Sequence, residues 1–458
     1  MIDHRPLMSG IVLAAVLAAS QSPAGSLTGW RGDNTGVYPD AQPPVSWSTS
    51  SNVVWKAKLP SWSNASPLIL GDKLFVCSEP ATLVCVALKD GAILWTRTNV
   101  YADILSPEET AKAKADSVKA EGLLAQIKPL REETRKNAEA LKKTPDDAAL
   151  KTKKDELKNQ LAPLEGELKR YSTYSLPATH EANGFSTPTP TTDGKVVYAL
   201  FGNGVAACYD VDGNRKWARL VEKPTQGWGH SGSPVFVDGK LIVHVLKVTA
   251  LDPSNGSTLW QTDSGSSWGS PVQTRIGDVG IIVTPGGDII RVSDGRKLAQ
   301  KVSGLAYCAP VVQNGIVYFV QRGGKAIRLP AAAADAIQPE TVWETKPKDD
   351  RYYASPVVQD GLIYAVTQHG DWSVIDAANG QIVYEHKLGL EGTVYPSVTL
   401  AGGLLFVSSD NGKTVILQPG REYKEIARNS LEAFRSCPVF VGQRAYVRGH
   451  DSLWCLGK

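Results

Sequence analysis

The chain reads SPVFVDGKLIV from Ser233 to Val243 and ALDPSNGSTLW from Ala250 to Trp260. The first stretch joins a small residue and a proline to an apolar run, a tight turn and a second apolar run. The turn, Asp238-Gly239, tolerates the positive φ that short hairpin loops require. The second stretch ends a third strand, turns at a glycine and leads to a fourth strand that carries a tryptophan. The stretch therefore predicts a unit of four short strands.

This unit recurs along the chain with a period of about 40 residues, which is the mark of a repeat architecture. Each copy begins with a small residue followed by proline, except one copy in which valine stands in place of the proline. The eight copies begin at Ser66-Pro67, Thr189-Pro190, Ser233-Pro234, Ser270-Pro271, Ala309-Pro310, Ser355-Pro356, Ser397-Val398 and Cys437-Pro438.

Four strands per copy is the composition of one blade of a β-propeller. The last copy ends at Lys458, one strand short, and Asn52-Val53-Val54-Trp55-Lys56 near the other end resembles the missing fourth strand. Closing the ring with this strand leaves no unpaired sheet edge, whereas a linear stack of repeats would leave it without a role. We therefore predict an all-β fold, an eight-bladed β-propeller with four-stranded blades that is closed by an N-terminal strand.

The copies resemble the PQQ-type repeats of bacterial quinoprotein dehydrogenases and of the BamB-type assembly factor, a family with many exported members. The pattern Ala-x-Asp-x-x-x-Gly-x-x-x-Trp is similar to that family's tryptophan-docking motif, in which the indole lies between neighbouring blades. The resemblance assigns this structural role to Trp55, Trp95, Trp217 and Trp260.

The resemblance covers residues 27–100 and 184–458, and we assign both ranges to the propeller. The opening Trp30-Arg31-Gly32-Asp33-Asn34-Thr35-Gly36 is similar to the start of an exported subgroup of the family. The motifs are specific for the fold and leave the function open, because one fold serves many unrelated functions.

Residues 1–20 have the features of a secretory signal peptide. His4 and Arg5 precede an apolar run from Ile11 to Ala19, and Ala18-Ala19-Ser20 supplies the small residues of a cleavage site. A buried strand or a short membrane anchor is the competing interpretation, but the run is too short to span a bilayer and no later stretch is apolar enough. We expect an exported, periplasmic or cell-envelope protein whose mature chain is a soluble monomer.

The charge of the chain is nearly balanced, with 49 basic and 46 acidic side chains and a net charge of +3. A protein whose main partner is nucleic acid or an anionic membrane carries a far larger basic excess. We therefore expect a protein or a glycan as the partner, and no nucleic acid.

Six cysteines are too few for a disulfide scaffold, and the absence of C-x-x-C gives no signal for zinc or thiol-redox chemistry. Cys208 and Cys455 take the place that Ala87, Ala250 and Val374 have in other copies, which predicts small buried apolar side chains. Cys77 and Cys85 fall on adjacent strands of one hairpin, where an oxidising compartment could join them. Both alternatives stay open for this pair.

Residues 101–183 interrupt the repeat, and the part from Ser106 to Arg170 predicts an inserted α-helical hairpin. Ser106-Pro107-Glu108-Glu109 forms a capping box with proline at the first helical position, and Thr144-Pro145-Asp146-Asp147 repeats this start signal. Pro129 and Pro163 should kink or end a helix locally. Two hypotheses stay open, an insertion without a function of its own and an arm that docks a partner near the mouth of the central channel.

The residues three positions before each anchor proline should lie at the rim of the channel. Four consecutive blades place aromatic side chains there, and an arginine follows. Aromatic faces bordered by hydrogen-bonding groups suit sugar rings or extended peptides, whereas simple filling of the pore is the competing interpretation. The predicted ligand-binding residues are Trp268, Tyr307, Tyr353, Tyr395 and Arg435, with His230, Trp62 and Trp228 in nearby connections.

Two turns combine histidine with aspartate, Gln368-His369-Gly370-Asp371 and Arg448-Gly449-His450-Asp451. Such a pair could serve metal binding or acid–base catalysis, but polar residues and glycine are expected in hairpin turns for conformational reasons. We assign no catalytic and no metal-binding residue.

The family resemblance implies an alternative function, because quinoprotein dehydrogenases use a quinone-bound calcium ion, an adjacent-cysteine ring and a catalytic aspartate. This sequence has no Cys-Cys pair and no Glu, Asn and Asp set that matches the metal ligands. We therefore predict no cofactor, with PQQ as the alternative. The leading hypothesis is a non-catalytic exported scaffold that binds a polypeptide or glycan at the channel mouth, as a BamB-like protein of envelope assembly; the alternative is a PQQ-dependent oxidoreductase.

Overall fold

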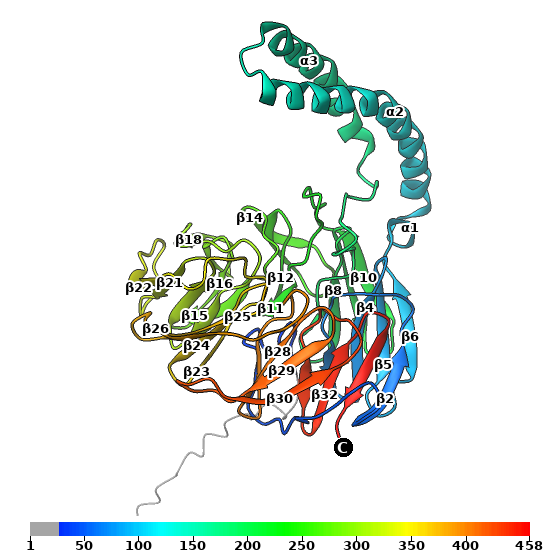
Figure 1. The fold of residues 1–458 in the computed structure, drawn as a ribbon. Helices are drawn as coiled ribbons and strands as arrows, with labels where there is room; N and C mark the ends of the chain where they lie inside the picture. Colours follow the sequence, from blue (N-terminus) through cyan, green and yellow to red (C-terminus); the bar gives the residue numbers. More distant parts are fainter. Residues whose placement is uncertain (1–26) are drawn as a thin grey trace, which may run out of the picture.

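A computed structural model describes residues 27–458, so the predicted signal peptide lies outside the described residues. The chain forms seven four-stranded sheets and one five-stranded sheet, arranged around a common centre (Figure 1). Within each blade the strands pair antiparallel, in chain order except where a strand from the N-terminal part of the chain joins the sheet. This architecture confirms the predicted eight-bladed propeller.

The first four blades follow one another along the chain, with the helical insertion between blades 1 and 2. Blade 1 consists of β3 (Leu68–Leu70), β4 (Lys73–Ser78), β5 (Thr82–Ala87) and β6 (Ile93–Thr98). Blade 2 consists of β7 (Thr191–Thr192), β8 (Val196–Leu200), β9 (Val205–Asp210) and β10 (Arg215–Leu220). Blade 3 consists of β11 (Val235–Val237), β12 (Lys240–His244), β13 (Lys247–Leu251) and β14 (Thr258–Asp263). Blade 4 consists of β15 (Val272–Ile276), β16 (Val279–Val283), β17 (Ile289–Arg291) and β18 (Lys297–Ala299).

The other four blades complete the circle. Blade 5 consists of β19 (Val311–Gln313), β20 (Ile316–Val320), β21 (Gly324–Arg328) and β22 (Glu340–Thr345). Blade 6 consists of β23 (Val357–Gln359), β24 (Leu362–Val366), β25 (Asp371–Asp376) and β26 (Ile382–Lys387). Blade 7 consists of β27 (Thr399–Ala401), β28 (Leu404–Ser408), β29 (Lys413–Leu417) and β30 (Glu425–Ser430), and blade 8 contains β31 (Val439–Val441), β32 (Arg444–Arg448) and β33 (Ser452–Leu456).

The N-terminal part of the chain closes the ring. Strand β2 (Val53–Lys58) pairs antiparallel with β33, with Trp55 opposite Cys455 and Lys56 opposite Trp454. Blade 8 thereby gains its fourth strand, and the edge of β33 is paired. The prediction that the two ends of the chain share one blade is confirmed.

Tryptophans on the outer strands of five blades bind to the blade that follows. The indole Nε1 of Trp95 donates to the carbonyl of Val211 in the following blade, at 3.1 Å. The ring covers Gly213, whose φ is +84° and where a Cβ would come within 2.7 Å of the indole, so this turn requires glycine. Trp55, Trp217 and Trp260 make the same two contacts with Leu88 and Gly91, Pro253 and Gly256, and Val292 and Gly295.

Trp343 in blade 5 is a fifth docking tryptophan that we did not predict. Its Nε1 donates to the carbonyl of Ala377 at 2.9 Å, and its ring covers Gly380 of blade 6. The segment that precedes Trp343 departs from the Ala-x-Asp-x-x-x-Gly pattern, so the motif does not identify this tryptophan. Tryptophan docking between blades therefore occurs at more positions than the sequence motif predicts.

A segment near the N-terminus crosses the centre of the ring on the face opposite the helices, where the dark blue trace runs in Figure 1. The carbonyl of Thr28 accepts hydrogen bonds from Thr191 and Thr192 of blade 2. Farther along, β1 (Val37–Tyr38) pairs parallel with β27 of blade 7. The segment therefore spans the channel from blade 2 to blade 7, and we call residues 27–38 the plug.

The insertion consists of a short helix α1 (Tyr101–Ile104) and two long helices, α2 (Pro107–Lys143) and α3 (Ala148–Tyr171). The predicted capping box is present, since Ser106 and Glu109 exchange side-chain and backbone hydrogen bonds. The second start signal is shifted, because Asp147 caps α3 whereas Thr144 ends α2. Both prolines lie inside the helices and neither ends one; α2 changes direction along its length in Figure 1.

All six cysteines are buried and free. Cys77 lies opposite Leu83 and Cys85 opposite Phe75, so these two thiols are not a directly facing pair. Burial raises the pKa of Cys85, Cys208 and Cys308 to about 12, which keeps these thiols protonated and apolar. The cysteines therefore act as small core residues in this structure.

Candidate functional site

The residues predicted to form the rim lie around the mouth of a cavity on the axis of the propeller. The cavity has a volume of about 370 Å³, and we call it the cup. All eight side chains that we call the rim line it and are half-buried. They are Asn64, Thr187, Ser231, Trp268, Tyr307, Tyr353, Tyr395 and Arg435.

A second layer lies two residues further along each repeat, deeper in the cup. We call its members the belt; all line the cup, and no more than 5% of the surface of each is exposed. Residues i and i+2 of an extended chain point to the same side, so each blade presents one rim and one belt side chain to the axis. The belt consists of Ser66, Thr189, Ser233, Ser270, Ala309, Ser355, Ser397 and Cys437.

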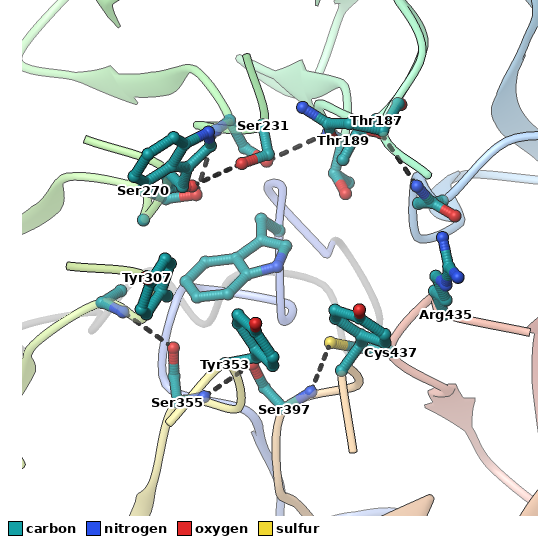
Figure 2. Close-up of a pocket in the computed structure, with 18 of the residues that line it drawn as sticks. Thr187, Thr189, Ser231, Ser270, Tyr307, Tyr353, Ser355, Ser397, Arg435 and Cys437 are labelled. Atoms are coloured by element: carbon teal, nitrogen blue, oxygen red, sulfur yellow. Dashed lines mark hydrogen bonds between the residues drawn. The ribbon is translucent and has the colours of Figure 1, made fainter. Parts of the chain in front are cut away.

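Hydrogen bonds run around the belt from each blade to the next. The backbone N–H of Ser66 donates to Thr189 Oγ1 at 3.0 Å, and the remaining blades repeat this contact in the same sense. The further donors are Thr189, Ser233, Ala309, Ser355, Ser397 and Cys437, whose acceptors are Ser233, Ser270, Ser355, Ser397, Cys437 and Ser66. Figure 2 shows the bonds that join Ser355, Ser397 and Cys437. The only break comes after Ser270, because Ala309 offers no side-chain acceptor.

Four of the rim side chains form a continuous aromatic wall. Trp268 stacks on Tyr307 at 5.5 Å between ring centroids, Tyr307 meets Tyr353 edge-on at 5.0 Å, and Tyr353 stacks on Tyr395 at 4.8 Å. The guanidinium of Arg435 lies over the Tyr395 ring at 4.7 Å, a cation–π contact. We call these four rings the aromatic arc.

The opposite half of the rim is polar and is bound to the base of the insertion. We call residues 172–183, which connect α3 to blade 2, the strap. Arg435 Nη1 and Asn64 Nδ2 both donate to the carbonyl of Ala182, at 2.7 and 2.9 Å. His180 stacks on Trp228 at 4.1 Å, and Ala182, Asn183 and Trp228 line the cup. The insertion therefore contributes directly to the mouth of the cup.

The plug closes the other end of the cup. Trp30 lines the cavity, and the guanidinium of Arg31 lies 5.3 Å from the Trp30 ring centroid. Arg31 Nη2 donates to the carbonyls of Pro356 and Val398, which directly follow two belt residues. Burial lowers the pKa of this arginine, while its Nε and Nη1 have no hydrogen-bond partner among residues 27–458. The channel is therefore a cup with a floor, which sequence reasoning did not foresee because the plug lies outside the repeats.

The structure corrects the predicted position of His230, which does not line the cup. Only 3% of its surface is exposed, and it borders a separate small cavity beside Gly229 and Trp268. Its Nε2 lies 2.9 Å from the carbonyl of Gly232, and burial lowers its pKa to about 4. His230 directly precedes Ser231, which lines the cup, and adjacent residues of an extended chain point to opposite sides, so the imidazole lies away from the cup.

The two His-Asp turns also lie outside the cup lining. His369 Nδ1 contacts Asp350 at 2.8 Å, and His450 stacks on Trp62 at 5.8 Å. The side chain of Arg448 is fully buried and bonds to the carbonyl of Ser61, which ties the last hairpin to the first blade. These contacts give the turns structural roles.

The chemistry that the cup offers follows from its lining. The side chains that line it, all within residues 27–458, include two arginines, hydroxyls, amides and indoles but no Asp, Glu or His. In this described part of the chain, no group of three or more His, Cys, Asp or Glu residues is placed to hold a metal ion. The cup can therefore bind by stacking, hydrogen bonding and positive charge, and its lining offers neither a carboxylate nor an imidazole.

The closed ring of docked repeats around one central cup defines the class of the protein, a PQQ-type β-propeller. A sequence profile of one family, described as outer membrane protein assembly factor BamB, matches residues 20–126, 174–281 and 246–456. These matches cover most of the chain and leave out the middle of the insertion. The chain belongs to this family.

Solved structures of similar fold include members of two functional groups. BamB from Moraxella catarrhalis is 11% identical with a TM-score of 0.55, and the match covers 89% of this chain and 97% of BamB. A europium-containing methanol dehydrogenase is 12% identical with a TM-score of 0.55, covering 92% and 89%. The quinohemoprotein alcohol dehydrogenase ADHIIG from Pseudomonas putida HK5 is 10% identical with a TM-score of 0.52, covering 92% and 78%. Among curated proteins, none matches in sequence.

At these identities the structures show the shared fold alone. They do not decide between a binding protein and an oxidoreductase. None of the helices between residues 27 and 458 is long and apolar enough to cross a membrane.

Proposed function

We propose that the protein is an exported, non-catalytic scaffold that binds a polypeptide or glycan in the cup, with a BamB-like role in envelope protein assembly. The observation that carries this proposal is the lining of the cup. It combines an aromatic arc with hydroxyls and arginines, and it offers no carboxylate or imidazole for acid–base chemistry. Such a surface binds and orients a ligand without a group to transform it.

The family match supports a polypeptide as the ligand, because the matched family is described as an assembly factor for outer membrane proteins. The same description supports export to the cell envelope, where the predicted signal peptide would direct the chain. The near-balanced charge of the chain fits this assignment.

The position of the insertion supports a second contact with the same ligand. Lys223 Nζ donates to the carbonyls of Ser172 and Ser175, both at 2.5 Å, and Glu79 accepts hydrogen bonds from the backbone of Phe185 and Ser186. The base of the hairpin is thus fixed to blades 1 and 2. The long helices rise from the mouth face (Figure 1), where they border anything that protrudes from the cup.

The second candidate function is a PQQ-dependent oxidoreductase, which the likeness to the two dehydrogenases favours. The aromatic arc and the two arginines could hold a flat, acidic molecule. Calcium sites in proteins take about six to eight oxygen ligands, with Asp and Glu carboxylates supplying the charge, whereas the cup lining contains no Asp or Glu. The residues present do not fit this metal-assisted group, and we derive no redox step from them.

The test compares the purified protein with the variant Tyr353→Ala/Tyr395→Ala on peptide and glycan arrays. We expect the variant to remain folded and to lose retention, because two adjoining rings of the arc are removed. The matched control, Tyr353→Phe/Tyr395→Phe, keeps the rings and should keep most of the binding. Unchanged retention by the alanine variant would reduce the arc to filling of the pore.

A parallel titration with PQQ and calcium separates the two functions. A red-shifted quinone spectrum together with alcohol-dependent dye reduction would replace the scaffold proposal by the oxidoreductase. For the arm, deletion of residues 106–170 with a Gly-Ser bridge should leave the melting temperature of the propeller unchanged, since this part of the insertion adds no strand to a blade. Unfolding of the whole protein would show that the hairpin is a structural element.

A further inference from the structure

Building on the proposed function, we propose that the cup receives the C-terminal end of a polypeptide, with the terminal carboxylate at Arg351 and the last side chain against the aromatic arc. Four observations carry this inference: the closed floor, an excess of hydrogen-bond donors, unpaired positive charge, and the insertion at the mouth. Each observation excludes some chemical classes of ligand.

The floor decides which part of a chain molecule can enter. Trp30 lines the cup, and the plug is bound to blade 2 through Thr28 and to blades 6 and 7 through Arg31. A chain cannot thread through the ring, so it enters with one end only. A volume of about 370 Å³ is near the lower limit for ligand pockets, and it accommodates a chain end rather than a folded domain.

The belt makes the cup rich in donors. Each of its six hydroxyl oxygens already accepts a backbone N–H from the preceding blade, and none of them donates to another described group within hydrogen-bond distance. Their O–H groups are therefore free to donate to a ligand in the cup. The six hydroxyls are those of Ser66, Thr189, Ser233, Ser270, Ser355 and Ser397.

The cup lining carries two arginines, and one of them, Arg351, has no ion-pair partner among the described residues. Arg351 lines the cup beside the arc, where its Nη1 lies 3.4 Å from the Tyr353 hydroxyl, and no described carboxylate lies within ion-pair distance of it. The nearby carboxylates are engaged elsewhere, Asp350 with His369 at 2.8 Å and Asp410 with Arg435 at 3.5 Å. Arg31 adds a buried positive charge beneath the floor.

A carboxylate fits this combination better than a neutral sugar does. Sugar hydroxyls donate as well as accept, and the acceptors that the cup lining offers them are neutral hydroxyl and amide oxygens, because it holds no carboxylate. A peptide terminus offers a carboxylate and carbonyl oxygens, which accept only. A guanidinium beside a carboxylate forms one of the stronger hydrogen-bonded pairs in proteins.

The mouth favours a polypeptide over an acidic glycan as the source of that carboxylate. Two apolar side chains project there, Trp228 and Leu176, each 58% exposed, and Trp228 lines the cup. They offer contacts to the side chains that precede a C-terminal residue. The helices beyond them, of 37 and 24 residues, give a macromolecular ligand a large surface outside the cup.

The experiment measures fluorescence anisotropy of the full-length protein with eight-residue peptides that carry fluorescein at the N-terminus. Each pool has a random sequence with one fixed last residue, Phe, Leu, Lys or Asp, and is made both as the free acid and as the C-terminal amide. We expect the free acids to bind about 10- to 100-fold more tightly than the amides, the range of one charge-assisted hydrogen bond.

Arg351→Gln should abolish this preference by weakening the free acids about tenfold or more while the amides change less than about twofold. Arg351→Lys retains the charge and should keep part of the preference. Arg351 is the residue to vary because its guanidinium bonds, among the described residues, to Tyr353 alone, whereas Arg435 also holds the strap.

The outcomes separate this inference from the proposed function. Equal affinity for acid and amide, lost in Tyr353→Ala/Tyr395→Ala, would overturn the chain-end inference and leave ligand binding in the cup standing. Binding of oligouronate without binding of any peptide pool would replace the polypeptide by an acidic glycan. Failure to bind peptides, oligouronate and neutral glycans alike would overturn both proposals.

Discussion

The belt and the rim occupy the same cup, two residues apart in every repeat, yet they differ in kind. The belt holds serine or threonine in six blades, with Ala309 and Cys437 in the others, and its hydrogen bonds run from blade to blade. The rim holds asparagine, threonine, serine, tryptophan, three tyrosines and arginine. The belt positions, at which the repeats have similar residues, link the blades. The rim positions, at which the repeats differ, form the candidate ligand-binding surface.

Geometry explains why one layer is uniform and the other is not. A belt side chain must be short and must accept a hydrogen bond from a buried backbone N–H of the neighbouring blade, which leaves few residue types. A rim side chain lies half-buried at the mouth, where the connections between blades vary in length and one of them carries the insertion. The rim is therefore free to differ between blades.

The largest effect is expected from breaking the belt at two distant blades. Ser233→Ala/Ser355→Ala leaves the buried N–H groups of Thr189 and Ala309 without acceptors. Each loss costs about 1–3 kcal/mol, and the sites share no partner, so the two add. Urea denaturation should show the unfolding free energy reduced by about 2–6 kcal/mol.

Cysteine provides the matched control for this variant, because Cys437 already serves as the belt acceptor for Ser397 at 3.3 Å. Ser233→Cys/Ser355→Cys should retain most of the stability that the alanine variant loses. Equal destabilisation by both double variants would show that the hydroxyls, rather than the acceptor function, matter at these positions.

The rim should respond in the opposite way. In Tyr353→Ala/Tyr395→Ala, loss of two aromatic pairs should lower the unfolding free energy by about 1–3 kcal/mol, while affinity for the bound peptide falls about 30-fold or more, as for aromatic hot spots. Denaturation and anisotropy on one preparation check this. Comparable losses of stability in the rim and belt variants would erase the distinction between the layers.

The pH dependence of stability tests whether the imidazole of His230 is buried. His230 adjoins the rim residue Ser231 in sequence, but its side chain does not line the cup. Its pKa is lowered to about 4 from the ordinary value of 6.5 by burial, with His244 nearby. Between these two pH values the unfolded chain binds more protons than the folded one, so stability is complete above about pH 6.5 and falls towards pH 4, by at most about 3 kcal/mol.

His230→Gln should therefore flatten the dependence of the unfolding free energy on pH between 6.5 and 4. Ser231→Ala, at the adjacent rim position, should keep the slope of the unmodified protein. A slope that His230→Gln leaves unchanged would place the imidazole in contact with solvent, as our sequence-based prediction had it.

The smallest expected effect is an increase in stability, caused by adding the missing hydroxyl to the belt. The belt is open between Ser270 and Ala309 because alanine has no acceptor, so Ala309→Ser should complete the circle. We expect the unfolding free energy to rise by about 0.5–1.5 kcal/mol, the net value of one hydrogen bond, in urea denaturation. A loss of stability would mean that the hydroxyl has no room beside Ser355, whose Oγ already accepts from the Ala309 N–H.

Much of the fold follows from the sequence because each repeat contains residues that mark where its strands begin, turn and dock. The Ser-Pro anchors, the Gly turns and the tryptophans mark each blade, and the incomplete last copy leads to the strand around Trp55. The rim residues follow from the same register. These features are local, and local patterns are what a single sequence displays.

The remaining features depend on contacts between blades or lie outside the repeat. The sequence identifies the belt serines only as the small residues that begin each repeat. Their role as acceptors depends on a backbone N–H that the neighbouring blade supplies. Trp30 and Arg31 of the plug have no repeat register, so nothing in the sequence places them at the axis. His230 was misplaced because it directly precedes the rim residue Ser231, and adjacent residues of an extended chain point to opposite sides.

The most direct test of the account is a crystal structure of the protein with a C-terminal free-acid peptide bound. The account predicts that the last side chain of the peptide lies in the cup between Trp30 and the aromatic arc, with its carboxylate within hydrogen-bond distance of Arg351. A peptide bound along the outer strands or on the helices, with the cup unoccupied by it, would contradict the account.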